Sequence, residues 1–121
     1  MKEFELKNRL EIQERFLKED AQKKLGHLAS DLARAASLIE MQMSRETIEA
    51  VMEESKFFAE WAVQDREPEL QMFLAEIQSS LALTALEWES FSTNSEWRQQ
   101  VVQSLRKWSD GLLKKAGWVS S

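Results

Sequence analysis

A helical repeat of apolar residues over positions 68–91 constrains the fold of this chain more than any other feature. Apolar residues recur there at steps of three and four, which places them on one face of a helix. This first face is formed by Leu70, Phe73, Leu74, Ile77, Leu81, Thr84, Ala85, Trp88 and Phe91. A second, weaker row lies nearly opposite and contains Met72, Ala75, Leu83 and Leu86. A helix that is apolar on two sides is typical of a central bundle position or a subunit interface.

The segments on either side begin and end like helices. Ser44 is placed to cap a helix that extends to about residue 65, with an acidic row on its solvent side. This row consists of Glu46, Glu49, Glu53 and Glu60. Thr93 and Glu96 match a capping box, and the helix that follows is expected to stop at Gly117, or earlier at Gly111. Its apolar face consists of Trp97, Val101, Leu105, Trp108 and Leu112.

The first segment raises the question of where its helix ends. Apolar residues over 25–43 occupy one sector of a helical wheel, and those over 6–21 occupy the same sector. Because the phase survives Gly26, the pattern favours one helix over about residues 2–43, at a cost of about 1 kcal/mol for the internal glycine. The alternative is a break near Gly26, which gives five helices instead of four.

These segments together predict an all-α fold, an up-and-down four-helix bundle with a long, extended first helix. The chain forms a single helical domain over 1–121, in which 25–116 are the bundle and 1–24 project as an arm. A lone amphipathic helix is only marginally stable in water, so we expect the arm to pair with its own copy as a coiled coil in a homodimer. The apolar residues of the arm are Phe4, Leu6, Leu10, Ile12, Phe16 and Leu17.

Composition argues against several classes of enzyme. The chain has no cysteine, and therefore no disulfide, thiol nucleophile or thiolate metal site. Its one histidine, His27, is about 130° from the apolar stripe and is expected at the surface. The Glu-x-x-His pairs of di-iron bundles are missing because Lys24 stands where the glutamate would be. With no glycine-rich phosphate loop or nucleophile motif, we expect a non-enzymatic protein without a cofactor or metal.

The net charge of −5 is unevenly distributed along the chain. Residues 44–92 carry three basic and eleven acidic side chains, whereas residues 93–121 carry five basic and two acidic ones. An acidic chain does not suit nucleic acid as its main partner. The basic helix over 97–118, with its tryptophans, suits either a membrane surface or, as we favour, an acidic bundle neighbour. Trp118 lies beyond the expected stop, and no role is assigned to it.

Hydropathy favours a cytoplasmic protein. No apolar run reaches the roughly 20 residues of a membrane span. The N-terminal sequence MKEFELKNRL has charges where a signal peptide has its apolar stretch.

The sequence therefore predicts an interaction or adaptor protein that self-associates through the N-terminal helix. The second face of the helix over 68–91 is a further candidate surface, formed by Met72, Leu83 and Leu86. The alternative is a sensor or carrier that binds an apolar small molecule inside the bundle. Five large aromatic residues are candidates to line such a pocket: Phe58, Phe73, Trp88, Trp97 and Trp108.

Overall fold

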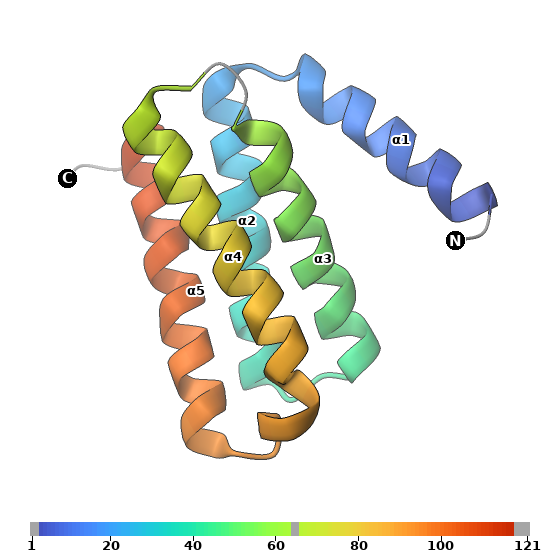
Figure 1. Cartoon of the computed structure of the whole chain (residues 1–121), viewed down its shortest axis with the longest axis vertical. Coiled ribbons are helices and arrows are strands. Elements are labelled where there is room, and N and C mark those ends of the chain that lie inside the picture. Colours follow the sequence, from blue (N-terminus) through green and yellow to red (C-terminus); the bar gives the residue numbers. More distant parts are fainter. Residues whose placement is uncertain (1–2, 64–65, 118–121) are drawn as a thin grey trace.

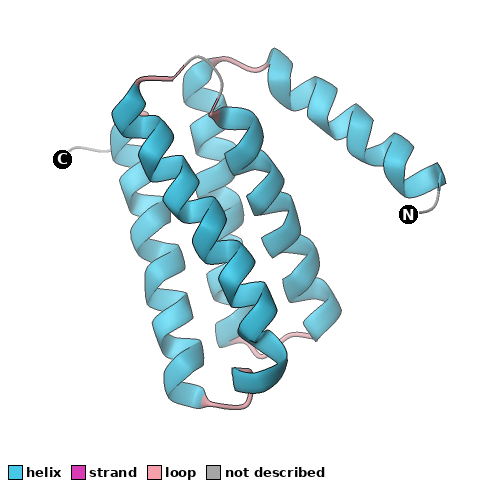
Figure 2. Ribbon diagram, in the orientation of Figure 1, coloured by secondary structure: helices cyan, strands magenta, loops and turns pink. Residues whose placement is uncertain are grey.

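The computed structural model describes residues 3–63 and 66–117, and all its regular elements in these ranges are helices that pack together (Figures 1 and 2). They are α1 (Glu3–Lys18), α2 (Ala21–Glu40), α3 (Arg45–Ala62), α4 (Pro68–Phe91) and α5 (Ser95–Lys115). The all-α prediction is confirmed. From α2 to α5 the helices run alternately up and down, and α1 lies across the outer side of α3 (Figure 1). The described residues thus form five helices, and the predicted set of four with a long first helix is not confirmed.

The first segment breaks at Glu19 and Asp20, upstream of the glycine. Asp20 has an extended backbone, and its Oδ1 accepts a hydrogen bond from the Lys23 amide at 2.8 Å, so it caps α2. Gly26 is buried inside α2 and is not the site of the break. The predicted single helix over 2–43 is therefore wrong, whereas the alternative of a broken first helix and five helices is confirmed, with the break at Asp20 instead of Gly26. A cap redirects the chain without changing the spacing of apolar residues, which is why the helical wheel did not reveal it.

Because of this break, α1 folds back against α3 instead of projecting as the expected arm. The Phe16 side chain is only 4% exposed, and its ring stacks on Phe58 with 4.5 Å between centroids. Trp61 packs beside both rings. Arg9 adds a hydrogen bond to Glu53 Oε1 at 3.0 Å. A buried aromatic side chain stabilises by about 2–3 kcal/mol, so Phe16 is the main anchor of α1.

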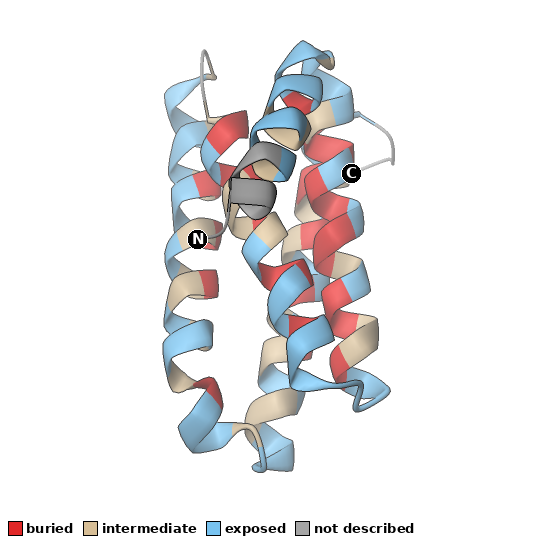
Figure 3. Ribbon diagram, turned by 90° about the vertical axis from the view of Figure 1, so that its right-hand side faces the viewer, coloured by how far each residue is buried: buried red, intermediate tan, exposed pale blue. Residues whose placement is uncertain are grey.

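α2 is the central helix of the molecule, packed between α3 and α5 (Figure 1). Buried residues follow its length (Figure 3) and include Leu25, Leu28, Ala29, Leu32, Ala35, Ala36 and Ile39. The alanines let the neighbouring helix approach closely. Ser109 of α5 donates a hydrogen bond to the Ala29 carbonyl at 2.8 Å, which satisfies a buried hydroxyl in this contact.

The other helix ends agree with the sequence except at the start of α5. The hydroxyl of Ser44 accepts an N–H from the first turn of α3, as predicted. The cap of α5 is Asn94 rather than Thr93, because the Asn94 side chain accepts the first-turn N–H at 3.0 Å. α5 continues through Gly111, so the earlier stop is wrong. It ends before Gly117, whose φ of +79° is easily adopted only by glycine.

Candidate interaction surface

The outer side of α4 carries an exposed apolar row. Its inward residues Leu74, Ile77, Leu81 and Trp88 are buried in the core. On the opposite side, Met72 is 74% exposed, Leu83 56% and Leu86 81%. Ala75 and Ser79 lie between them and are also exposed, so the row is uncharged over most of the helix. The predicted second apolar face therefore exists, and nothing in the described residues covers it.

A groove runs beside this row, between α4 and α5. It has a volume of about 220 Å³ and includes Leu83, Thr84 and Glu87 of α4 and Trp97, Gln100, Val101, Ser104 and Trp108 of α5. The two tryptophans are only half-buried, so part of each indole faces the groove. Trp97 also meets Trp88 edge to face, with 5.5 Å between centroids. α4 and α5 are in looser contact than α2 and α5, and the groove lies between them.

At the other end of this helix pair, a glycine allows a closer approach. A Cβ built on Gly111 would lie 3.0 Å from the ring of Phe73, tighter than ordinary packing. The same ring lies 5.2 Å from the Lys115 ammonium. The α4–α5 face therefore opens from a close contact at Gly111 towards the tryptophan-lined groove.

Carboxylates border the apolar row of α4 on the side towards α5. Glu69, Glu76 and Glu87 lie about 60–80° from the centre of the row on a helical wheel. Among the described residues none of the three is in an ion pair, in contrast to the acidic row of α3, where Glu49 pairs with Arg45. The acidic row of α3 is exposed, as predicted. Unpaired carboxylates beside an apolar row give this surface both a hydrophobic and an electrostatic character.

The candidate residues of α1 are only partly accessible. Leu10 is 55% exposed and Leu17 is exposed, whereas Phe16 is committed to the contact with α3. Phe4 and Leu6 belong to α1, but their side chains lie outside the described residues. Within the described part of α1, Leu10 and Leu17 are thus the predicted contact residues that remain accessible.

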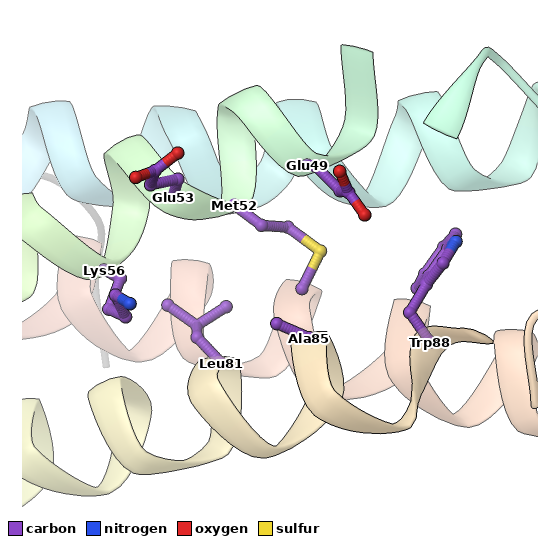
Figure 4. A pocket seen from close by; sticks show the side chains of 7 residues that line it. All are labelled: Glu49, Met52, Glu53, Lys56, Leu81, Ala85 and Trp88. Atoms are coloured by element: carbon purple, nitrogen blue, oxygen red, sulfur yellow. The ribbon is translucent and has the colours of Figure 1, made fainter. Parts of the chain in front are cut away.

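A second cavity, also of about 220 Å³, lies between α3 and α4 (Figure 4). Its apolar part is formed by Met52, Leu81, Ala85 and Trp88, and Glu49, Glu53 and Lys56 add charged groups from α3. The five aromatics expected to line one pocket are instead divided among several contacts. Trp88 lines this cavity, Trp97 and Trp108 line the α4–α5 groove, and Phe58 stacks on Phe16.

A buried carboxyl at the α2–α3 interface was not anticipated from the sequence. Burial, together with the neighbouring Glu54, raises the pKa of Asp31 to about 8, and Arg34 lowers it in part. The Arg34 Nη2 lies 3.3 Å from Asp31 Oδ1, while Oδ2 has no hydrogen-bond partner among the described residues. The available signal was that Asp31 follows the core residue Leu28 by three positions, which places it on the inward side of α2.

The remaining candidates add no reactive centre to the described residues. His27 is exposed as predicted, with Nε2 3.9 Å from Glu19 Oε1. The described residues contain no group of three or more His, Cys, Asp or Glu placed to hold a metal ion. Over the same ranges, no helix combines the length and hydropathy that a membrane crossing requires. Trp118 lies outside the described residues.

Comparison with known proteins does not indicate a function for this chain. No family model matches the chain, and neither a curated protein nor a solved structure shows significant similarity to it.

Proposed function

We propose that this chain is a non-enzymatic helical interaction protein that binds its partner through the apolar row of α4 and the adjoining α4–α5 groove. The observation that carries the proposal is the line of three large, mostly exposed apolar side chains: Met72, Leu83 and Leu86. Covering one such side chain completely contributes about 1.5–3 kcal/mol, so a partner that buried the whole row would gain substantial affinity. Exposed apolar patches on soluble proteins commonly mark interaction sites.

The composition of the groove favours binding over catalysis. Its walls present indoles, aliphatic side chains, hydroxyls and an amide, with Glu87 as the one carboxylate among them. General acid–base chemistry needs paired groups within hydrogen-bond reach of a substrate, and this lining does not supply such a pair. Aromatic rings with one exposed edge are instead typical anchors of protein interfaces.

The proposal includes self-association, but through a different surface from the one that the sequence predicted. The N-terminal helix was the expected contact, but Phe16 is already used against α3. α1 therefore offers Leu10 and Leu17, whereas the α4 row offers three exposed apolar side chains beside a groove, two of which, Met72 and Leu86, are more exposed than either leucine of α1. We assign the main contact to α4 and a secondary one to α1.

A photo-crosslinking residue at position 83 tests the proposed surface. In cells producing the full chain, a benzophenone side chain in place of Leu83 should form protein adducts. The same group in place of Ser30, an exposed position on α2, should form few. An excess of unlabelled chain should compete the adducts at position 83 away, and unlabelled chain with Leu83→Asp should not. Equal labelling at the two positions would contradict the proposed function.

A second candidate function, binding of an apolar small molecule, is favoured by the α3–α4 cavity. Nearly buried Met52, Leu81 and Trp88 line it, so a ligand there would contact apolar groups (Figure 4). Its volume is below the roughly 300 Å³ of typical ligand pockets, which restricts the ligand to a small aromatic or aliphatic molecule. Indole and short alcohols should then raise the melting temperature, and filling the cavity with Ala85→Phe should abolish the shift. Equal shifts in both proteins would remove this candidate.

A further inference from the structure

One end of the α4–α5 groove is acidic. Glu87 of α4 lines the groove together with Trp97 of α5, and Glu96 directly precedes Trp97 in the chain. Because the Trp88 and Trp97 rings meet with 5.5 Å between their centroids, Glu87 and Glu96 lie at about the same height on the two helices. Over the described part of the chain, neither carboxylate is in an ion pair. Two carboxylates without counter-ions therefore flank a half-buried indole.

The arginines nearest to this end are bound to other groups. Arg98 donates hydrogen bonds to two backbone carbonyls, at 2.8 and 3.0 Å. Arg106 pairs with Glu40 of α2, and Arg45 of α3 pairs with Glu49. Glu87 is only half-exposed, and a partly buried charge is favourable only when an opposite charge is beside it. The Trp97 end of the groove therefore favours a cation from outside the chain.

The other end of the same face has a mixed charge. Lys107 follows Glu96 by eleven residues, which is about 16 Å along α5. Around and beyond it, acidic and basic side chains occur in equal numbers and favour neither sign. They are Glu69, Glu76 and Asp110 on one hand, and Lys107, Lys114 and Lys115 on the other. A charged group of a partner is thus selected at the Trp97 end only.

We infer that the partner is an amphipathic helix that places an arginine side chain at Trp97, between Glu87 and Glu96. This inference rests on the proposed function and names the chemistry of the partner of the same surface. A guanidinium suits the site because it stacks on an indole and pairs with carboxylates through its planar donors. The arginine lies at one end of the partner's apolar face, since Glu87 is one turn from the row residue Leu83.

The rest of the row suits a helix. Met72 and Leu86 are fourteen residues apart, about 21 Å along α4, so a helix of about four turns covers the row. Ala75 and Ser79 are small and exposed, and they leave room between the large side chains for those of the partner. α4 and α5 run antiparallel beside each other (Figure 1), and a helix over their groove contacts both.

Self-association through the same row is then the weaker mode of binding. α4 carries four carboxylates and no basic side chain, so two copies that meet along α4 bring only like charges together. Like charges across an interface weaken it. A partner helix with an arginine pairs with the carboxylates instead and displaces the second copy.

Two matched helical peptides test the inference. Both carry the same row of leucines, and they differ at one residue a turn beyond that row, which is arginine in one peptide and its neutral isostere citrulline in the other. Isothermal titration calorimetry with the full chain measures their affinities. At about 50 mM salt the arginine peptide should bind about tenfold more tightly, and at about 0.5 M salt the difference should fall to about threefold.

Neutral variants locate the charge that selects the arginine. Glu87→Gln and Glu96→Gln should each lower the affinity for the arginine peptide about threefold, and the double variant should bind both peptides equally. Glu46→Gln with Glu60→Gln, on the exposed acidic row of α3, changes the net charge by the same amount and should preserve the preference. Leu86→Ser shortens a highly exposed side chain of the row and should weaken both peptides alike.

Three results would overturn the inference: equal affinities of the original chain for the two peptides, a preference for arginine that survives in the double glutamine variant, or no binding of either peptide. These results leave the proposed function in place, because it fails by equal photo-crosslinking at positions 83 and 30. Adducts at position 83 that consist only of chain dimers, and that an excess of the arginine peptide does not reduce, would keep the function and overturn the inferred partner.

Discussion

α2 and α4 are both long, apolar helices, and the chain uses them in opposite ways. α2 has 20 residues and buries nine of them, whereas α4 has 24 and buries four. The difference arises from packing, because α2 packs closely against both α3 and α5, while α4 packs closely against α3 and only loosely against α5. Apolar side chains therefore stabilise this fold only where the chain covers them, and those left uncovered on α4 are available for a partner.

The sharpest test of this comparison replaces the same residue type on each helix. Leu32→Ala in α2 removes a fully buried side chain and should lower the free energy of unfolding by about 2–5 kcal/mol. Leu83→Ala in α4 should change it by less than about 0.5 kcal/mol, because its side chain is mostly exposed. Urea denaturation at a concentration where the chain is monomeric measures both. Similar losses in the two variants would show that the α4 row is covered within the chain.

The next largest effect is expected at α1, which is held mainly by the buried side chain of Phe16, whereas α2 is held by many buried side chains. Phe16→Ala should lower the local stability of α1 by about 3 kcal/mol, since it removes the ring stacked on Phe58. Hydrogen exchange should then accelerate over residues 8–18 while α2 stays protected. Leu17→Ala, at an exposed neighbouring position, is the matched control and should change little. Loss of protection throughout α2–α5 would show that α1 is integral to the core.

A pH titration probes the one carboxyl buried in α2. The pKa of Asp31 is about 8 in the folded chain and 3.8 ordinarily, so the folded state binds this proton more tightly. The stability from Asp31 is therefore complete below about pH 4 and declines as the pH rises towards about 8. Asp31→Asn should remove this decline and raise stability at pH 8 by about 2 kcal/mol. Equal pH slopes between pH 4 and 8 in both proteins would contradict a buried, protonated Asp31.

The smallest effect is expected where α2 ends. Gln42 has a φ of +54°, in the left-handed region, and it follows α2 in the turn that leads to α3. Gln42→Gly should therefore raise the free energy of unfolding by about 0.5–1 kcal/mol. Thermal unfolding measures the gain. Gln103→Gly, at an exposed position within α5, should instead cost about 1 kcal/mol. A loss at position 42 would indicate that the Gln42 side chain contributes more than its backbone strain costs.

The sequence by itself determined most of the helical pattern. The period of α4 predicted both of its faces, since a regular helix converts spacing in the chain directly into direction in space. Ser44 and Gly117 marked helix ends through local backbone chemistry that needs no tertiary contact. The angle between His27 and the apolar stripe on the helical wheel was also enough to place His27 at the surface. These inferences succeeded because each depends on residues within about one turn of one another.

Tertiary packing decided what the period could not. The helical wheel predicted a continuous helix over the first segment, but Asp20 caps a new helix there. Phe16 packs against Phe58 and Trp61, which lie more than forty positions away in the sequence. The burial of Asp31 likewise depends on where α3 packs. The exposed row of α4 was visible as a pattern, yet only the arrangement of the other helices left it uncovered. Spacing fixes direction along one helix, whereas burial depends on which distant segment fills the space beside it.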